Sequence, residues 1–136
     1  MSREKQQKEA HRWIQTARED LETAEILFEK ERYAHCCFHC QQAGEKAIKA
    51  LFYAYEKQPW GHSLLSLLME IEKEGFLSNV ETIKEEAALL DKFYIPTRYP
   101  DGLPALTPSQ VYTKKEAVRA LEAAKKVLNF CLSNLK

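Results

Sequence analysis

The chain has 136 residues, and its twenty basic and twenty acidic side chains give a formal net charge of zero at pH 7. Such a chain has no overall field that attracts nucleic acid or an anionic membrane. Half of the residues are Ala, Glu, Lys, Leu or Arg, whereas there are only four Gly and five Pro. This composition favours long helices and excludes sandwiches and barrels with many tight turns. The length favours one domain over residues 1–136.

Nothing in the sequence indicates a membrane or secreted protein. No apolar run approaches the roughly 20 residues that cross a bilayer, and the segment MSREKQQKEA is too charged for a signal peptide. The four cysteines, at 36, 37, 40 and 131, are too few and too clustered for a disulfide framework. We therefore expect a cytoplasmic protein with reduced thiols and no membrane contact.

Two long helices are predicted in the first half of the chain. From about Lys8 to Lys30, apolar residues recur at spacings of three and four and form one stripe. From about Tyr33 to Glu56 the apolar arc is wider and contains small residues, which allow close approach of neighbouring helices. This second segment is therefore expected to be the central helix.

Three more helices are predicted in the second half of the chain. A short third helix is expected within residues 62–75, with Gly75 at its C-terminal end. Ser78 and Glu81 have the spacing of a capping box for a fourth helix, and Thr113 and Glu116 have it for a last helix. Together these segments predict an all-α fold, a five-helix antiparallel up-and-down bundle of four long helices and one short helix.

The run His35-Cys36-Cys37-Phe38-His39-Cys40 has the composition of a metal site. Structural zinc needs four ligands, however, and one helical turn offers only two or three. Helical spacing also places Cys37 and Cys40 on the apolar arc, and His35 and His39 on the polar one. We expect buried thiols, surface histidines, no metal and no cofactor.

The polar edge of the central helix carries Gln42, Glu45, Lys46 and Lys49. In one interpretation this is a solvated face, on which Glu45 and Lys49 form an ordinary i,i+4 pair. In the other it lines a groove, where lysine binds phosphate and glutamine binds the edge of a base. The spacing alone favours the solvated face.

Residues 95–112 are expected to form a connection without helix, which is long for a compact bundle. Arg98 lies in it next to Tyr99 and four residues after Tyr94. An arginine beside tyrosine rings suits a phosphate and a nucleobase. Alternatively, Arg98 pairs with Asp91 or Asp101 and holds the connection in place.

Three separated stretches of the chain resemble the HEPN domain (higher eukaryotes and prokaryotes nucleotide-binding). They are WIQTAREDLETAEILFEKERYAHCCFHCQQAGEKAIKALF, GHSLLSL and LLDKFYIPTRYPD, and they occur in the order found in that family. The resemblance implies a helical bundle and a homodimer. It also implies a minimal nucleotidyltransferase as partner in a toxin–antitoxin-type module.

Many HEPN proteins are metal-independent ribonucleases with an Arg-x4-6-His motif. Arg98 lies in the corresponding region, but no histidine follows it in this sequence. An imidazole is the usual proton carrier at neutral pH, so this departure argues against cleavage. We therefore expect a non-catalytic protein that binds nucleotide or RNA or pairs with a nucleotidyltransferase. The alternative is a metal-independent endoribonuclease that uses Arg98 with Tyr94 or Tyr99.

The family fold packs the central helix near the proline-rich connection. The sequence therefore predicts one partly open ligand groove, lined by Arg98, Tyr94, Tyr99, Gln42, Glu45 and Lys46, with Lys49 on the same helix edge. Because no conventional catalytic set is present, these residues are assigned to ligand binding and none to catalysis.

Overall fold

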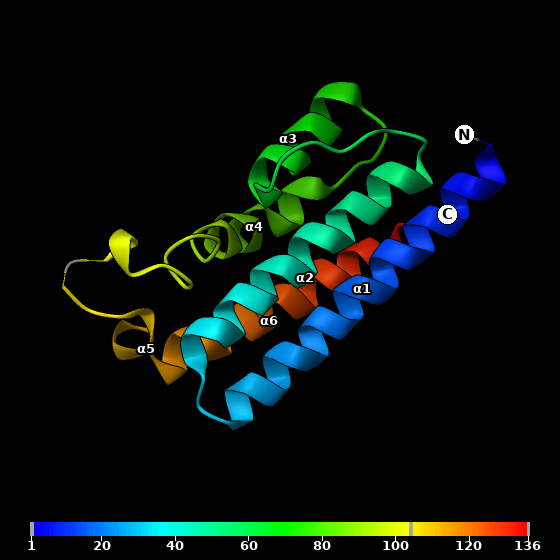
Figure 1. The fold of residues 1–136 in the computed structure, drawn as a ribbon. Coiled ribbons are helices and arrows are strands. Elements are labelled where there is room, and N and C mark those ends of the chain that lie inside the picture. The colour runs from blue at the N-terminus through cyan, green and yellow to red at the C-terminus, as the bar shows by residue number, and fades with distance from the viewer. Residues whose placement is uncertain (1, 104, 136) are drawn as a thin grey trace.

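The computed structural model describes residues 2–103 and 105–135, and its regular structure there is entirely helical (Figure 1). Three long helices, α1, α2 and α6, lie side by side, and the shorter helices α3 and α4 pack beside α2. The elements are α1 Arg3–Glu29, α2 Tyr33–Ala54, α3 Leu64–Glu74, η1 Val80–Ile83, α4 Lys84–Asp91, η2 Pro100–Gly102, α5 Pro108–Val111 and α6 Lys114–Ser133, where η marks a 3-10 turn.

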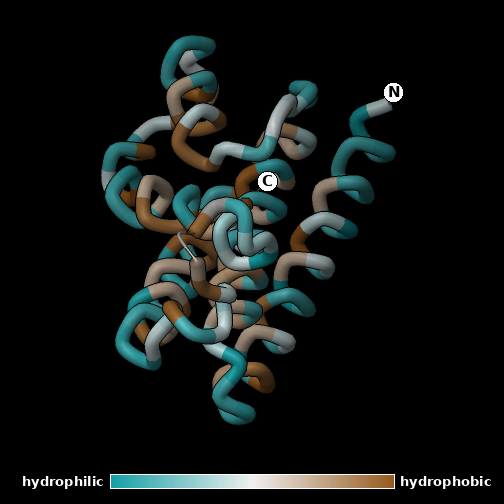
Figure 2. The backbone as a smooth tube through the Cα atoms, turned by 60° about the vertical axis from the view of Figure 1, so that its left-hand side comes forward, coloured by the Kyte–Doolittle hydropathy of each residue, from teal (hydrophilic) through white to brown (hydrophobic). Residues whose placement is uncertain are grey.

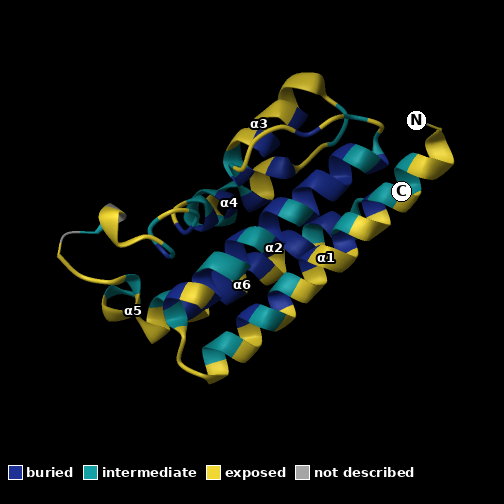
Figure 3. Cartoon of the chain, viewed as in Figure 1, coloured by how far each residue is buried: buried dark blue, intermediate teal, exposed yellow. Residues whose placement is uncertain are grey.

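The central position of α2 is confirmed, since this helix contacts α1, α3, α4, α5 and α6. Figure 3 shows it as the most continuously buried helix of the bundle. Its small residues allow this crowding: a Cβ atom added at Gly44 would lie 2.6 Å from Leu64 Cδ2 and 3.0 Å from Leu90 Cδ1. The side chains of Leu64 on α3 and Leu90 on α4 therefore pack directly against the α2 backbone at Gly44.

The predicted helical periodicity accounts for the core. Hydrophobic and hydrophilic segments alternate along the long helices (Figure 2). The buried side of α1 consists of Ala10, Ile14, Ala17, Leu21 and Ala24, as the stripe in the sequence predicts. All of these side chains except Ala10 join one continuous apolar core with α2, α3, α4 and α6. Removing such surface from water is the main favourable contribution to folding.

The all-helical bundle is confirmed, but two local predictions are wrong. The Ser78–Glu81 capping box is not formed, because the chain turns at Asn79 with φ 67° and enters a 3-10 turn. Val80 and Ile83 are each 1% exposed, so the burial of these two side chains decides the local backbone. The fourth helix then ends at Asp91 and is short.

The connection 95–112 also contains helix, contrary to the prediction. It includes η2 and the four-residue α5, which raises the number of α-helices in the described residues to six. A capping box between Thr107 and Gln110 begins α5, and Pro108 occupies its first turn. The capping box predicted from Thr113 and Glu116 does begin α6. Within residues 2–103 and 105–135, none of the helices has the length and apolarity that crossing a bilayer requires.

Candidate functional site

Arg98 lies among three aromatic rings. Its guanidinium carbon is 4.2 Å from the ring centroid of Phe38 on α2, 4.8 Å from that of Tyr94 and 5.2 Å from that of Tyr99. Its Nε and Nη2 atoms donate hydrogen bonds to the backbone carbonyl of Tyr94, at 2.9 and 2.7 Å. The structure thus brings together the arginine and both tyrosines of the predicted groove.

The predicted pairing of Arg98 with Asp91 or Asp101 is absent among the ion pairs of the described residues. Asp91 instead caps α3: its carboxylate accepts hydrogen bonds from Ser63 Oγ at 2.7 Å and from the backbone N–H groups of Leu64 and Leu65 at 2.6 and 3.1 Å. The aspartate therefore joins the end of α4 to the start of α3, and Arg98 is held by a carbonyl and by aromatic rings.

His62 precedes α3 and reaches the same cluster. Its imidazole stacks on the Tyr94 ring with centroids 4.9 Å apart and planes at 18°, and Nδ1 lies 3.1 Å from Glu45 Oε2. The side chain is 59% exposed, so solvent reaches the ring. His62 is not among the residues that the sequence predicts for the site. The available signal was its position in GHSLLSL, one of the three HEPN-like stretches.

Glu45 is the buried centre of the polar residues on α2. It is 4% exposed, and besides His62 it accepts hydrogen bonds from Lys49 Nζ at 2.9 Å and from Gln41 Nε2 at 2.9 Å. A buried carboxylate is tolerated only with such partners. The Glu45–Lys49 pair predicted from spacing therefore exists, but it is buried and does not lie on a solvated face.

Gln42 joins this network, whereas Lys46 does not. Gln42 Nε2 donates to Gln41 Oε1 at 2.8 Å. Lys46 Nζ lies 2.7 Å from Asp20 Oδ2, and His39 Nδ1 lies 3.2 Å from the other oxygen of Asp20. Burial raises the pKa of Asp20, but the hydrogen bonds and charges of His39 and Lys46 outweigh it and hold that pKa below its ordinary value. Lys46 thus belongs to a neighbouring cluster between α1 and α2.

All four cysteines are buried, and the predicted burial of Cys37 and Cys40 is confirmed. Burial raises the pKa of the Cys37 thiol to about 12 and also raises that of Cys131. His35 is exposed, as predicted, but His39 is half-buried against Asp20. Among residues 2–103 and 105–135, no group of three or more His, Cys, Asp or Glu side chains is placed to hold a metal ion.

We call the connected set the Arg98–Glu45 site. It consists of Phe38, Gln41, Gln42, Glu45, Lys49, His62, Tyr94, Arg98 and Tyr99, linked by the contacts above. Arginine and histidine donate hydrogen bonds to phosphate, aromatic rings stack with bases, and amides bind base edges. The site therefore carries the groups that recognise a nucleotide.

Comparison with known proteins places the chain among helical relatives of similar length. The model of the HEPN domain matches residues 10–135. The structure of TT1696 from Thermus thermophilus has 41% sequence identity and a TM-score of 0.87, covering 93% of this chain and 98% of that one. The structure of ST0689, an archaeal HEPN homologue, has 31% identity and a TM-score of 0.78, with the same coverage.

A curated relative carries a functional name. A protein of Methanocaldococcus jannaschii named "Putative toxin MJ1304" is 28% identical over 140 residues, which covers 95% of this chain and 90% of the relative.

Proposed function

The chain belongs to the HEPN domain family, and we propose that it binds a nucleotide or RNA at the Arg98–Glu45 site as part of a toxin–antitoxin-type module. The observation that carries this proposal is the position of Arg98, which lies among three rings and is joined through Tyr94 to His62. Cations next to stacking surfaces are the combination that binds single nucleotides and unpaired RNA.

The toxin–antitoxin role and its protein partners are proposed from similarity to other proteins. The name of the Methanocaldococcus protein supports a toxin role, and the resemblance in sequence supports a homodimer with a minimal nucleotidyltransferase as partner. Coexpression with a nucleotidyltransferase encoded beside this chain, followed by copurification and native mass spectrometry, tests both assemblies. A 15.8 kDa monomer that never captures the partner would contradict them. The cytoplasmic location stays a prediction.

Calorimetric titration with adenosine monophosphate and with a short single-stranded RNA tests binding. Arg98→Ala should weaken it by about 1–3 kcal/mol, the range for a hydrogen bond to a charged group. Arg119→Ala, which removes an exposed arginine of α6, is the matched control and should leave affinity unchanged. Equal affinity for both variants would place the ligand elsewhere.

A specific observation favours endoribonuclease activity as a second candidate function. No histidine follows Arg98 in the chain, but His62 precedes it and lies against Tyr94. A carboxylate at Nδ1, here Glu45, orients an imidazole for proton transfer. In place of the tyrosine first considered, His62 would take the proton from a ribose 2′-hydroxyl. O2′ would attack phosphorus, the P–O5′ bond would break, and the leaving O5′ would take a proton from solvent water, which reaches the site.

The products of that reaction are a 2′,3′-cyclic phosphate and a 5′-hydroxyl, which mass spectrometry of a digested RNA identifies. Cleavage should be lost in His62→Ala and in Arg98→Ala. Intact RNA after prolonged incubation with protein that binds it would contradict the enzyme and leave the binding function standing.

A further inference from the structure

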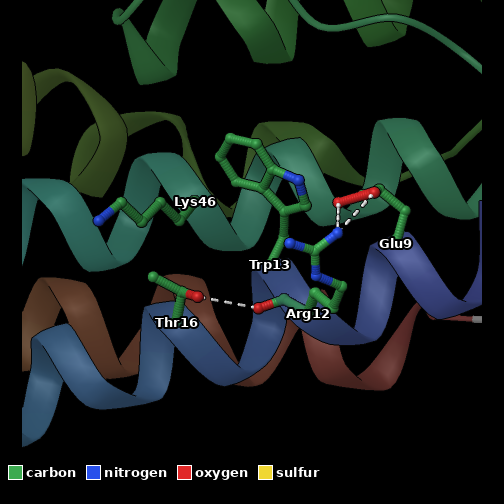
Figure 4. Close-up of a pocket in the computed structure, with 5 residues that line it drawn as sticks. All are labelled: Glu9, Arg12, Trp13, Thr16 and Lys46. Atoms are coloured by element: carbon green, nitrogen blue, oxygen red, sulfur yellow. Dashed lines mark hydrogen bonds and ion pairs between the residues drawn. The ribbon is translucent and has the colours of Figure 1, made fainter.

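A hollow of about 270 Å³ lies between α1 and α2 (Figure 4). It is lined by Glu9, Arg12, Trp13, Thr16 and Lys46, none of which belongs to the Arg98–Glu45 site. Pockets for drug-sized ligands have volumes of roughly 300–1,000 Å³. The hollow is thus suited to a small flat group such as one nucleobase.

Trp13 gives the hollow a rigid aromatic surface. Its indole stacks on the Tyr53 ring of α2, with centroids 5.6 Å apart and planes at 26°. The indole is half-buried and also lines the hollow, so part of its surface is available there. Indole rings held in this way are the stacking platforms that unpaired bases use, and they accept every base.

Arg12 and Glu9 lie beside the indole, and dashed lines in Figure 4 mark their ion pair. The Arg12 Nη1 atom is 3.2 and 3.3 Å from the two oxygens of Glu9, and the arginine side chain is 78% exposed. The Glu9 side chain is 25% exposed, so the pair is partly solvated, and its contribution to stability is small. A phosphate can therefore replace Glu9 as the partner of Arg12 at low cost.

Lys49 lies between Trp13 of the hollow and Glu45 of the Arg98–Glu45 site. Its ammonium group is 2.9 Å from Glu45 Oε2 and 5.8 Å from the centroid of the Trp13 ring. Glu45 in turn contacts His62, which stacks on Tyr94. The Lys49 side chain is 11% exposed, so this positive charge lies just below the surface between the two sets of aromatic rings.

We propose that the hollow is a second base subsite and that the ligand is a single-stranded oligonucleotide. One nucleotide lies at the Arg98–Glu45 site, the backbone passes over the buried Lys49 without a direct bond to it, and a following base stacks on Trp13 with its phosphate toward Arg12. This inference rests on the proposed binding function, which it extends from a mononucleotide to a strand.

Fluorescence of Trp13 tests the proposal directly. The chain has two tryptophans, so Trp60→Phe, which replaces an 80% exposed side chain, leaves Trp13 as the only one. This protein is titrated with adenosine monophosphate, ribo-hexaadenylate and deoxy-hexaadenylate. We expect the hexamer to quench Trp13 and to bind at least tenfold more tightly than the monophosphate, which should bind without quenching.

Two variants test whether the hollow accounts for the higher affinity of the hexamer relative to the monophosphate. In Trp13→Leu the ratio of hexamer to monophosphate affinity should fall to about one, and in Arg12→Ala it should fall several-fold. Arg18→Ala, a change at an exposed arginine of the same helix, should leave the ratio as it is. A tenfold preference for the ribose hexamer assigns the ligand to RNA, and equal affinity assigns it to single strands of either sugar.

The remaining outcomes separate this proposal from the proposed function. Equal affinity for hexamer and monophosphate, or saturation without a change in Trp13 fluorescence, would overturn the second subsite and leave nucleotide binding intact. Failure of both ligands to bind would overturn both.

Discussion

The imidazole of His62 lies nearly parallel to the ring of Tyr94, with ring centroids 4.9 Å apart and planes at 18°. The two residues come from different segments, one before α3 and one after α4. The Tyr94 ring also contacts the guanidinium of Arg98, and the His62 imidazole also contacts the carboxylate of Glu45. Tyr94 is therefore the residue through which the arginine and the buried carboxylate are connected.

Replacement of Tyr94 tests the importance of this ring. Tyr94→Phe keeps the stacked face, so it should bind nucleotide as the wild type does. Tyr94→Leu loses the stacking, and we expect it to weaken binding by about 0.5–1.5 kcal/mol, the range for aromatic pairs. Calorimetry on both variants makes the comparison. Equal losses in the two would show that the hydroxyl group, and not the ring, acts in binding.

Arg98 should contribute to stability as well as to binding. The structure gives it two hydrogen bonds to a carbonyl and three ring contacts. We expect Arg98→Ala to lower the free energy of unfolding by about 1–3 kcal/mol. Arg98→Lys keeps the charge without the planar fork and should recover only part of the loss. Urea unfolding measures both. A fully stable alanine variant would contradict this role.

Asp91 should control how α3 is placed against α4. Its carboxylate accepts three hydrogen bonds from Ser63, Leu64 and Leu65, and Ser63 adjoins His62. We expect Asp91→Ala to cost about 1–3 kcal/mol of unfolding free energy and to weaken nucleotide binding through displaced His62. Asp101→Ala, at an exposed position, is the control and should change stability by less than about 0.5 kcal/mol. Equal stability of the two variants would rule out the capping role.

Asp20 should make stability depend on acid pH. Its folded pKa lies below its ordinary value, so the ionised form stabilises the folded chain at and above about pH 4, near the unfolded pKa. This stabilisation is lost as the pH falls through the folded pKa. Urea midpoints of the wild type and of Asp20→Asn should therefore differ most near neutral pH and converge below about pH 4. A constant difference across that range would contradict the assignment.

The cysteines should be protected from alkylation in the folded chain. All four side chains are fully buried. Burial raises the pKa of the Cys37 thiol to about 12, whereas a hydrogen bond with Cys40 lowers the pKa of Cys36, so for Cys36 burial alone gives the protection. Because the thiolate is the reacting form and needs access to the reagent, iodoacetamide should label none of them at pH 8. In urea above the unfolding midpoint, mass spectrometry should show all four labelled. Rapid labelling of native protein would contradict this protection, and it would indicate opening of α2 or, for Cys131, of α6.

Local signals in the sequence were reliable where no distant packing opposed them. The Thr113–Glu116 capping box needs only a few neighbouring residues, and it forms. The Ser78–Glu81 box has the same pattern, but Val80 and Ile83 are buried in the core and the chain adopts a 3-10 turn. A capping box contributes on the order of 1 kcal/mol, which is less than the burial of two large apolar side chains.

The residues of the Arg98–Glu45 site also divide into those that local sequence predicts and those that only distant packing brings together. Tyr94, Arg98 and Tyr99 are close in sequence, so their association could be predicted. His62 and Phe38 come from distant segments, and only the packing of α2 against α3 and α4 brings His62 to Tyr94 and Phe38 to Arg98. The spacing of Glu45 and Lys49 predicts their contact but carries no information about its burial, which depends on neighbouring elements.

The ammonium group of Lys49 is shared, since it lies between the carboxylate of Glu45 and the indole of Trp13. A ligand at either place that attracts the Lys49 ammonium group changes the electrostatic potential at the other place. Thermodynamic linkage then requires reciprocity: the factor by which an occupant at Trp13 alters affinity at Arg98 equals the factor in the reverse direction. We therefore expect Lys49 to couple ligand affinity at the Arg98–Glu45 site to ligand affinity at the hollow beside Trp13. The coupling free energy then belongs to both places together and to neither alone.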